Sequence, residues 1–255
     1  MKKLFLLFVI VLITNNTFSQ NEVLSIVTTH DEIDLSEVNL TTIPTKGPYL
    51  LSANQISSLL ELNDMPDIVL PDSILIDDII WTGDDFIVHS GYEIISLNNF
   101  AEPLMDFDTP DFEIFPLDEK HIYIVSHQQE VSLLFLVNLK VKRAKRILTI
   151  GERIVNVSQL GEATMVATEN NIYLFKDKEC MRYLSLWSPL RTAVMTSCGL
   201  VFATDSSICL LIGVDQFLWL FEAQTKRLLY DSQYLYIQLK DGDLLRCDIS
   251  AIVKE

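Results

Sequence analysis

The residues in this sequence best suited to chemistry are three acids in one short segment. Asp106, Asp108 and Asp111 lie in the run Asp-Phe-Asp-Thr-Pro-Asp, which has carboxylates at closely spaced positions. Calcium takes about six to eight oxygen ligands, so a run of this kind could hold calcium. The segment lacks the glycine and the glutamate that an EF-hand loop needs. Because acid clusters are most often solvated, we expect an exposed connection with no metal and no cofactor.

Nucleophilic catalysis has a weaker basis in the sequence. His89 and His127 each precede a predicted turn, and Ser and Asp are frequent, so a Ser/His/Asp set could be assembled in many ways. The sequence has neither a Gly-x-Ser-x-Gly elbow nor a Gly-rich phosphate loop. Paired carboxylates of a glycoside hydrolase leave no fixed spacing, so that chemistry stays open. An exported hydrolase is therefore the alternative to a binding function.

Three tryptophans offer a different kind of site. Trp187, in the segment Leu-Trp-Ser-Pro, is expected in a loop, where its ring could stack on a sugar or a peptide. Trp81 and Trp219 fall within apolar strands and are expected in the core. The partner class is accordingly a protein or a small-molecule or glycan ligand.

A repeated hairpin must position these residues. From residue 45 onward, a short apolar strand, a polar turn and a second apolar strand occur six times. The spacings between successive turn centres are 37, 38, 41, 36 and 35 residues, and the centres lie near Asn54, Gly91, Gln129, Asn170, Ser206 and Asp241. A hairpin that recurs at this period is typical of a propeller blade.

This pattern resembles the β-propeller superfamily across roughly residues 33 to 249, at the level of blade period rather than of one family. The resemblance implies an all-β fold, a six-bladed propeller of four-stranded antiparallel blades. Because stacked blades cover a middle strand on both sides, such a strand should lose the alternation of apolar and polar residues. The segments 133–137 and 208–212 do lose it. No WD40, kelch or sialidase-type motif is present.

The ends of the chain raise the question of how the ring closes. Residues 23–27 could add an outer strand to the last blade, which would close the ring with an N-terminal strand and remove an exposed edge. Residues 20–255 then form a single domain. In the alternative, residues 20–65 are a separate N-terminal region and 66–255 the propeller, with a short helix over 52–62.

The resemblance also predicts where a ligand binds. The turn between the two middle strands of each blade should lie on the same face as the connections between blades, and propellers usually bind there. Tyr92, Trp187, Asp106, Asp108 and Asp111 are the residues expected on this face. Many other residues there are neutral turn formers, which turn chemistry alone explains.

The N-terminus predicts export. Lys2 and Lys3 precede an apolar run from Leu4 to Ile13 and a polar stretch that ends at Ser19, the pattern of a signal peptide over residues 1–19. The apolar run is too short to span a membrane, so no membrane insertion is expected after the signal is removed. We expect a periplasmic or extracellular location.

Net charge and cysteines limit the partners and the covalent structure. Loss of Lys2 and Lys3 with the signal changes the net charge from −16 to −18, which repels nucleic acid and anionic membranes. Four cysteines, Cys180, Cys198, Cys209 and Cys247, allow three complete disulfide pairings in an oxidising compartment. Buried free thiols are an equal alternative.

Overall fold

The structure, a computed structural model, describes residues 24–26, 35, 38–43, 46–52, 54–59, 68–99, 102–177, 179–212 and 216–253. The expected signal peptide, residues 1–19, lies outside the described residues. No helix in the described part of the chain is long and apolar enough to cross a membrane.

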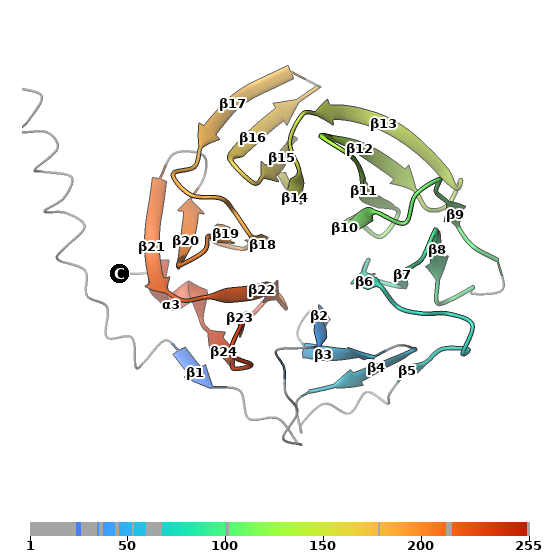
Figure 1. The fold of residues 1–255 in the computed structure, drawn as a ribbon, viewed down its shortest axis with the longest axis horizontal. Helices are drawn as coiled ribbons and strands as arrows, with labels where there is room; N and C mark the ends of the chain where they lie inside the picture. Colours follow the sequence, from blue (N-terminus) through green and yellow to red (C-terminus); the bar gives the residue numbers. More distant parts are fainter. Residues whose placement is uncertain are drawn as a thin grey trace, which may run out of the picture.

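Six four-stranded antiparallel sheets form a ring, and one strand of each sheet lies nearest the centre (Figure 1). The chain is a six-bladed β-propeller. From the inner to the outer strand, blade 1 consists of β2 (Asn39–Ile43), β3 (Gly47–Ser52), β4 (Gln55–Ser58) and β5 (Ile68–Val69), and blade 2 of β6 (Asp78–Trp81), β7 (Phe86–Ser90), β8 (Glu93–Ser96) and β9 (Met105–Asp106). Blade 3 consists of β10 (Phe112–Asp118), β11 (His121–Gln128), β12 (Val131–Asn138) and β13 (Arg143–Ile150), and blade 4 of β14 (Ile154–Leu160), β15 (Ala163–Thr168), β16 (Asn171–Lys176) and β17 (Glu179–Ser185). Blade 5 consists of β18 (Thr192–Thr196), β19 (Gly199–Ala203), β20 (Ser207–Ile212) and β21 (Gln216–Glu222), and blade 6 of β22 (Thr225–Tyr230), β23 (Leu235–Leu239), β24 (Leu244–Cys247) and β1 (Leu24–Ile26). A short helix, α3 (Ile249–Val253), follows β24.

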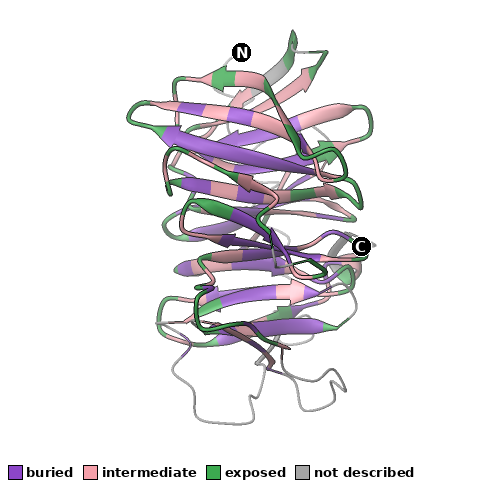
Figure 2. Ribbon diagram, turned by 90° about the vertical axis from the view of Figure 1, so that its right-hand side faces the viewer, coloured by how far each residue is buried: buried purple, intermediate pink, exposed green. Residues whose placement is uncertain are grey.

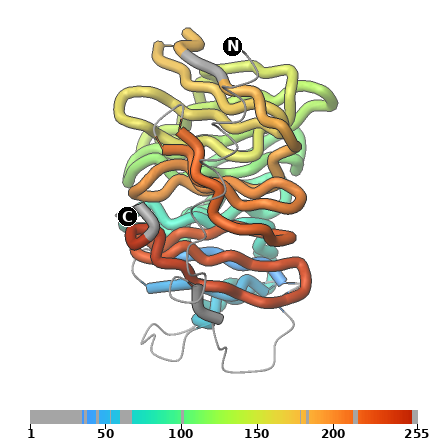
Figure 3. Tube along the Cα trace, turned by 90° about the vertical axis from the view of Figure 1, so that its left-hand side faces the viewer, coloured from blue at the N-terminus to red at the C-terminus, as the bar shows by residue number. Residues whose placement is uncertain are grey.

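The N-terminal strand closes the ring, as the sequence predicted. β1 pairs with β24 in antiparallel register, with Leu24 opposite Cys247 and Ile26 opposite Leu245. The first and last parts of the chain therefore lie side by side, where blue and red segments meet in Figure 3. The buried Gln238 of β23 also joins blade 6 to blade 1, because its side-chain amide donates a 2.9 Å hydrogen bond to the carbonyl of Val38, directly before β2.

The core is divided among the six interfaces between successive blades. In β19, Leu200 and Phe202 pack in the cluster toward blade 4, while Val201 and Ala203 pack in the cluster toward blade 6. All four side chains are fully buried. Figure 2 shows burial concentrated in the strands and exposure at the turns. Two-sided coverage explains why the middle strands lack alternation, as expected.

The structure decides two alternatives that the sequence left open, the conformation of residues 55–58 and the state of the cysteines. Residues 55–58 form β4, so the helix considered over 52–62 is wrong; pairing of β4 with β3 and β5 outweighs the helical spacing of its apolar residues. All four cysteines are free thiols. Burial raises the pKa of Cys209 to about 11 and that of Cys247 to about 12, so both are unreactive near neutral pH.

Candidate functional site

The turns between middle strands and the connections between blades share one face, as expected. Backbone hydrogen bonds join them directly: the N–H of Phe107 donates to the carbonyl of Tyr92, and the N–H of Leu186 donates to the carbonyl of Asn170, each at 2.8 Å. We call this side of the ring the loop face. These connections are thus fixed on the hairpin turn of the blade that precedes them.

A channel runs along the centre of the ring and has a volume of about 690 Å³. All six inner strands line it. Its acidic and basic lining residues balance, four of each, although the whole chain carries a net charge of −16. The acids are Asp77, Asp78, Glu113 and Glu169, and the bases are Arg153, Arg191, Lys226 and Arg227.

The charges at the channel mouth are arranged by blade. Near the start of the inner strands, blades 2 and 3 contribute Asp77, Asp78 and Glu113, whereas blades 4, 5 and 6 contribute the four basic residues together with a single acid, Glu169. The mouth therefore has an acidic and a basic side. A ligand that carries both signs of charge would meet both.

Most of these charges already have partners. Arg227 of blade 6 lies 3.0 Å from Asp78 of blade 2, and blade 1 lies between the two blades. Arg153 lies 3.0 Å from Glu113 of blade 3. Arg191 is paired with Asp205 at 2.7 Å. Its hydrogen bond lowers the pKa of the Asp205 carboxyl below the usual range and outweighs the opposing effect of desolvation. These pairs set the charge pattern but leave few free acids for catalysis.

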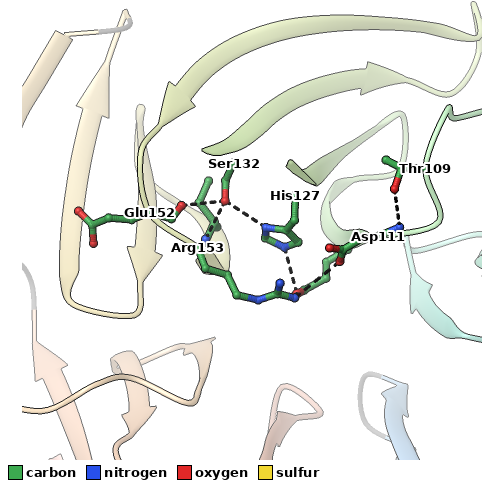
Figure 4. A network of polar contacts seen from close by, with 8 residues as sticks. Thr109, Asp111, His127, Ser132, Glu152 and Arg153 are labelled. Carbon is green, nitrogen blue, oxygen red and sulfur yellow. Dashed lines mark hydrogen bonds and ion pairs between the residues drawn. The ribbon is translucent and has the colours of Figure 1, made fainter. Parts of the chain in front are cut away.

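A serine, a histidine and a glutamate make a chain of contacts beside the channel (Figure 4). Oγ of Ser132 lies 3.0 Å from Nδ1 of His127, and Nε2 of His127 lies 3.2 Å from Oε1 of Glu113. Ser132 is only 1% exposed; its hydroxyl donates to the carbonyl of Glu152 and accepts the N–H of Ile154. Because the hydroxyl proton is held by a carbonyl and no substrate can reach the oxygen, Ser132 is a structural link rather than a nucleophile.

The carboxylate of Glu152 holds the connection before β14 onto the hairpin of blade 4. It accepts hydrogen bonds from Oγ1 of Thr168 and the hydroxyl of Tyr173, both at 2.6 Å, and from Nδ2 of Asn171 at 2.9 Å. Burial would raise the pKa of Glu152, but these hydrogen bonds outweigh it, and the pKa lies below its ordinary value of 4.5. The unprotonated carboxylate is thus the form that the fold selects.

We expect Glu152→Gln to destabilise the protein in a pH-dependent way. Since the folded pKa is lowered, the contribution of Glu152 is complete above the unfolded value of 4.5 and is lost as the pH falls through the folded pKa. The difference in free energy of unfolding between parent and variant should be constant near neutrality and shrink below pH 4.5. Urea unfolding across this pH range measures it, with the exposed Glu93→Gln as a control of the same charge change. A difference that stays constant down to strongly acidic pH would contradict the role assigned to the carboxylate.

The predicted acidic connection lies on the loop face. Asp106, Asp108 and Asp111 are all exposed, and Phe107 between the first two turns inward to pack on Phe112 with ring centroids 4.7 Å apart. Asp111 lies 3.9 Å from Arg153. Within the described residues, no group of three or more His, Cys, Asp or Glu side chains could hold a metal ion.

The predicted aromatic residues do not converge on one point. Tyr92 is 54% exposed in the β7–β8 turn, beside the acidic connection. Trp187 is 55% exposed in the connection from blade 4 to blade 5. Blade 3 and blade 4 lie between these two positions, so the five predicted residues form two separate groups.

Trp187 belongs to an aromatic cluster at the surface of blade 5. Its ring lies 6.2 Å from that of Trp219 at an interplanar angle of 20°, and 5.4 Å from that of Phe217 at 79°. Trp219 is 49% exposed, so the expectation that it is a core residue is wrong. We call Trp187, Phe217 and Trp219 the aromatic ledge. Exposed apolar side chains in such a group are typical of a binding surface.

Sequence reasoning missed Trp219 and the basic residues of the channel. Trp219 was missed because β21 contains a bulge. Phe221 pairs with Ile208 and Trp219 with Cys209, so Leu220 is left unpaired. The bulge lets Phe221 face blade 6 while Trp219, two residues earlier, does not. Two of the basic residues could have been predicted from the sequence, because Arg153 and Arg191 each directly precede an inner strand.

The comparisons with known proteins give the fold and no family. No family model matches the chain, and no curated protein does. Among solved structures, a chain in the mitotic checkpoint complex matches 92% of this chain and 96% of its own, with a TM-score of 0.61 and 8% identity. Virginiamycin B lyase from Staphylococcus aureus matches 84% of this chain and 81% of its own, with a TM-score of 0.61 and 13% identity. BamB from Moraxella catarrhalis matches 89% of this chain and 100% of its own, with a TM-score of 0.52 and 11% identity. Identities this low show a shared fold alone.

Proposed function

We propose that this chain is an exported binding module that holds a segment of a partner protein on the aromatic ledge, which extends from the loop face at Trp187 onto the outer strand of blade 5. The aromatic ledge carries the proposal, because Trp187 and Trp219 are each about half exposed although they are among the largest apolar side chains. Tryptophan is enriched among the residues that dominate binding energy at protein interfaces. One similar structure, the mitotic checkpoint complex, is by its name an assembly, which is compatible with this use of the fold.

The rival function, an exported hydrolase, has less support. The Ser132 hydroxyl is buried and bonded to a backbone carbonyl. The acids of the channel mouth lie beside arginines, as in the pairs Asp78 with Arg227 and Glu113 with Arg153. These carboxylates are thus engaged by cations of the protein itself, which leaves them less free to act on a substrate. Because virginiamycin B lyase has a similar fold, the test below includes an enzymatic assay.

Export rests on the signal-like residues 1–19, and it places the partner in the periplasm or outside the cell. Expression of the full chain with a C-terminal tag in a Gram-negative host, followed by N-terminal sequencing of the exported protein, measures it. We expect the exported protein to begin at Gln20. A chain that keeps residues 1–19 and sediments with membranes would contradict export.

Binding is tested by selecting peptides from a phage-displayed dodecapeptide library on residues 20–255. We expect selected peptides to bind the parent, and Trp187→Ala or Trp219→Ala to weaken them about tenfold or more, as truncation of a buried anchor does. Tyr92→Ala is the matched control, an equally exposed aromatic residue two blades away. Fluorescence anisotropy gives the dissociation constants.

Three results would contradict the proposal. If Tyr92→Ala and the tryptophan variants had equal effects, the ledge would not be the site. If the protein instead bound no peptide but hydrolysed p-nitrophenyl esters or glycosides, and Ser132→Ala or Glu113→Gln abolished that turnover, the hydrolase would replace the binding module. Binding of soluble tetrasaccharides in place of peptides would assign the ledge to glycans.

A further inference from the structure

One edge of this acidic protein is strongly basic. Five of its 19 Lys and Arg residues fall within residues 140–146, in the turn before β13 and the first half of that strand. All five are exposed; they are Lys140, Lys142, Arg143, Lys145 and Arg146, and we call them the basic edge. The rest of the chain then carries a net charge of −16 − 5 = −21.

The basic edge has no internal counter-charge. Among the residues that the structure describes, no carboxylate forms an ion pair with any of the five side chains. Lys142 donates a 3.4 Å hydrogen bond to the carbonyl of Pro103, a neutral group. Like charges this close repel one another, so anions from another molecule would be favoured there.

The same segment is the outer edge of a sheet. β13 pairs with β12 on one side and is the outermost strand of blade 3, on the rim of the ring in Figure 1. With 8 residues, it is longer than β17 and β21 with 7 each and than β1, β5 and β9 with 3, 2 and 2. A long edge presents unpaired backbone groups to which an extended peptide can add as a further strand.

Protection against unwanted strand pairing does not explain this concentration of charge. Lysine on an edge strand does discourage aggregation. However, β21 is an outer strand of nearly the same length, and it contains no Lys or Arg. A general need to protect edges would act on both strands, so the basic edge calls for a reason specific to blade 3.

The side chains of the basic edge lie on both faces of blade 3. Lys145 is opposite Leu136, which packs toward blade 4, and Arg146 is opposite Phe135, which packs toward blade 2. Cross-strand partners project to the same face of a sheet, so successive cations point to opposite faces. A strand added to this edge would meet a cation on each face, which favours acids at consecutive positions.

A groove beside the edge could take an apolar side chain. It has a volume of about 530 Å³ and lies between blades 3 and 4, where its apolar lining consists of Leu117, Leu136, Ile147, Leu148 and Phe175. Three acids line it as well: Asp118, which is paired with His121 at 3.0 Å, Glu162, which is paired with Lys176 at 2.6 Å, and Asp177. Pockets beside an added strand give such complexes their specificity.

We propose that the basic edge binds an extended acidic segment of another polypeptide, which pairs with β13 as a fifth strand of blade 3. A polypeptide fits better than a nucleic acid or an anionic membrane, because only a polypeptide can satisfy the backbone groups of the edge. A large polyanion would also meet the net negative charge of the remaining chain. The site is separate from the aromatic ledge and stands independently of it.

The test uses residues 20–255 and a fluorescein-labelled peptide, Thr-Val-Glu-Glu-Glu-Glu-Val-Thr. We expect binding at low salt, weakened about tenfold by Lys145→Glu and further by Arg143→Glu with Lys145→Glu, since charge reversal replaces attraction with repulsion. Lys240→Glu makes the same charge change in the β23–β24 turn and should have little effect. Trp187→Ala should have none, which separates this site from the ledge.

Strand addition is tested by methylating the backbone nitrogens of the four glutamates, which keeps their charge and removes their N–H donors. We expect the methylated peptide to lose binding. Equal binding of the methylated peptide would overturn strand addition, and equal loss with Lys240→Glu would overturn the assignment to β13. Binding of phosphatidylglycerol vesicles but not of the peptide, with dependence on Lys145, would assign the edge to membranes instead.

Discussion

A chain that begins at residue 28 should unfold more readily than one that begins at residue 22, because it lacks β1. Three residue pairs join β1 to β24, and backbone hydrogen bonds contribute roughly 1 kcal/mol each, so we expect a loss of about 3 kcal/mol. The chain that begins at residue 22 keeps every paired residue of β1 and is the matched control. Urea unfolding followed by tryptophan fluorescence measures the difference.

Loss of β1 should also change how the protein associates. It leaves β24 as an unpaired edge, and such edges pair with other chains. We expect concentration-dependent dimers or larger species by light scattering for the shorter chain alone. If both chains had the same unfolding midpoint and stayed monomeric, β1 would not close the ring in solution.

Gly199→Ala should cost about 4 kcal/mol of stability, because the backbone there needs both a conformation and a space that only glycine allows. Gly199 begins β19 with φ of +143°. A Cβ atom at this position would overlap the carbonyl oxygen of Leu211 and lie 3.3 Å from Cα of Ile212. These are backbone atoms of β20, so relief would require parting two paired strands at the core of blade 5.

Gly161→Ala is the matched control for this prediction. Gly161 lies in the corresponding turn of blade 4 with φ of +60°, and a Cβ there meets nothing within 4 Å. The left-handed conformation alone costs a non-glycine residue about 1 kcal/mol. Urea unfolding of both variants measures the additional loss at Gly199, which combines its φ of +143° with the overlap on Leu211, and equal losses would show that neither adds a cost.

The fold could be predicted from the sequence because its signals are local and repeated. Each hairpin carries its own turn residues and apolar strands, and six copies at one period leave few other architectures. The matched segments around Thr168 and Thr204 show this, since Oγ1 of each threonine lies close to the carbonyl oxygen three residues later, 3.0 Å from that of Asn171 and 3.4 Å from that of Ser207. The weakest copy, at β3 and β4, was the one that allowed a helix instead.

The candidate site could be predicted only in part, because it depends on contacts between blades. The pair of Arg227 with Asp78 joins residues 149 positions apart and requires the curvature of the closed ring. One bulge in β21 puts Trp219 on the opposite face of the blade from the buried Phe221, which sequence alternation does not reveal. The positions of Trp187 and of the 106–111 acids in connections between blades could be predicted because turn and loop residues are recognised locally.

Ring closure by β1 also dictates an order of folding. During synthesis the chain emerges from its N-terminus, so Leu24–Ile26 appear first, and their partner Leu244–Cys247 appears among the last residues. Contacts between such distant segments form slowly, because the entropy of closing a long loop is lost before the paired strands gain their hydrogen bonds. Blades 1 to 5 can each complete their sheets as they emerge. Blade 6 is complete only when β1, which is synthesised first, pairs with β24, which is synthesised last. We therefore expect refolding to show an open-ring intermediate, whose slow final phase disappears when β1 is removed.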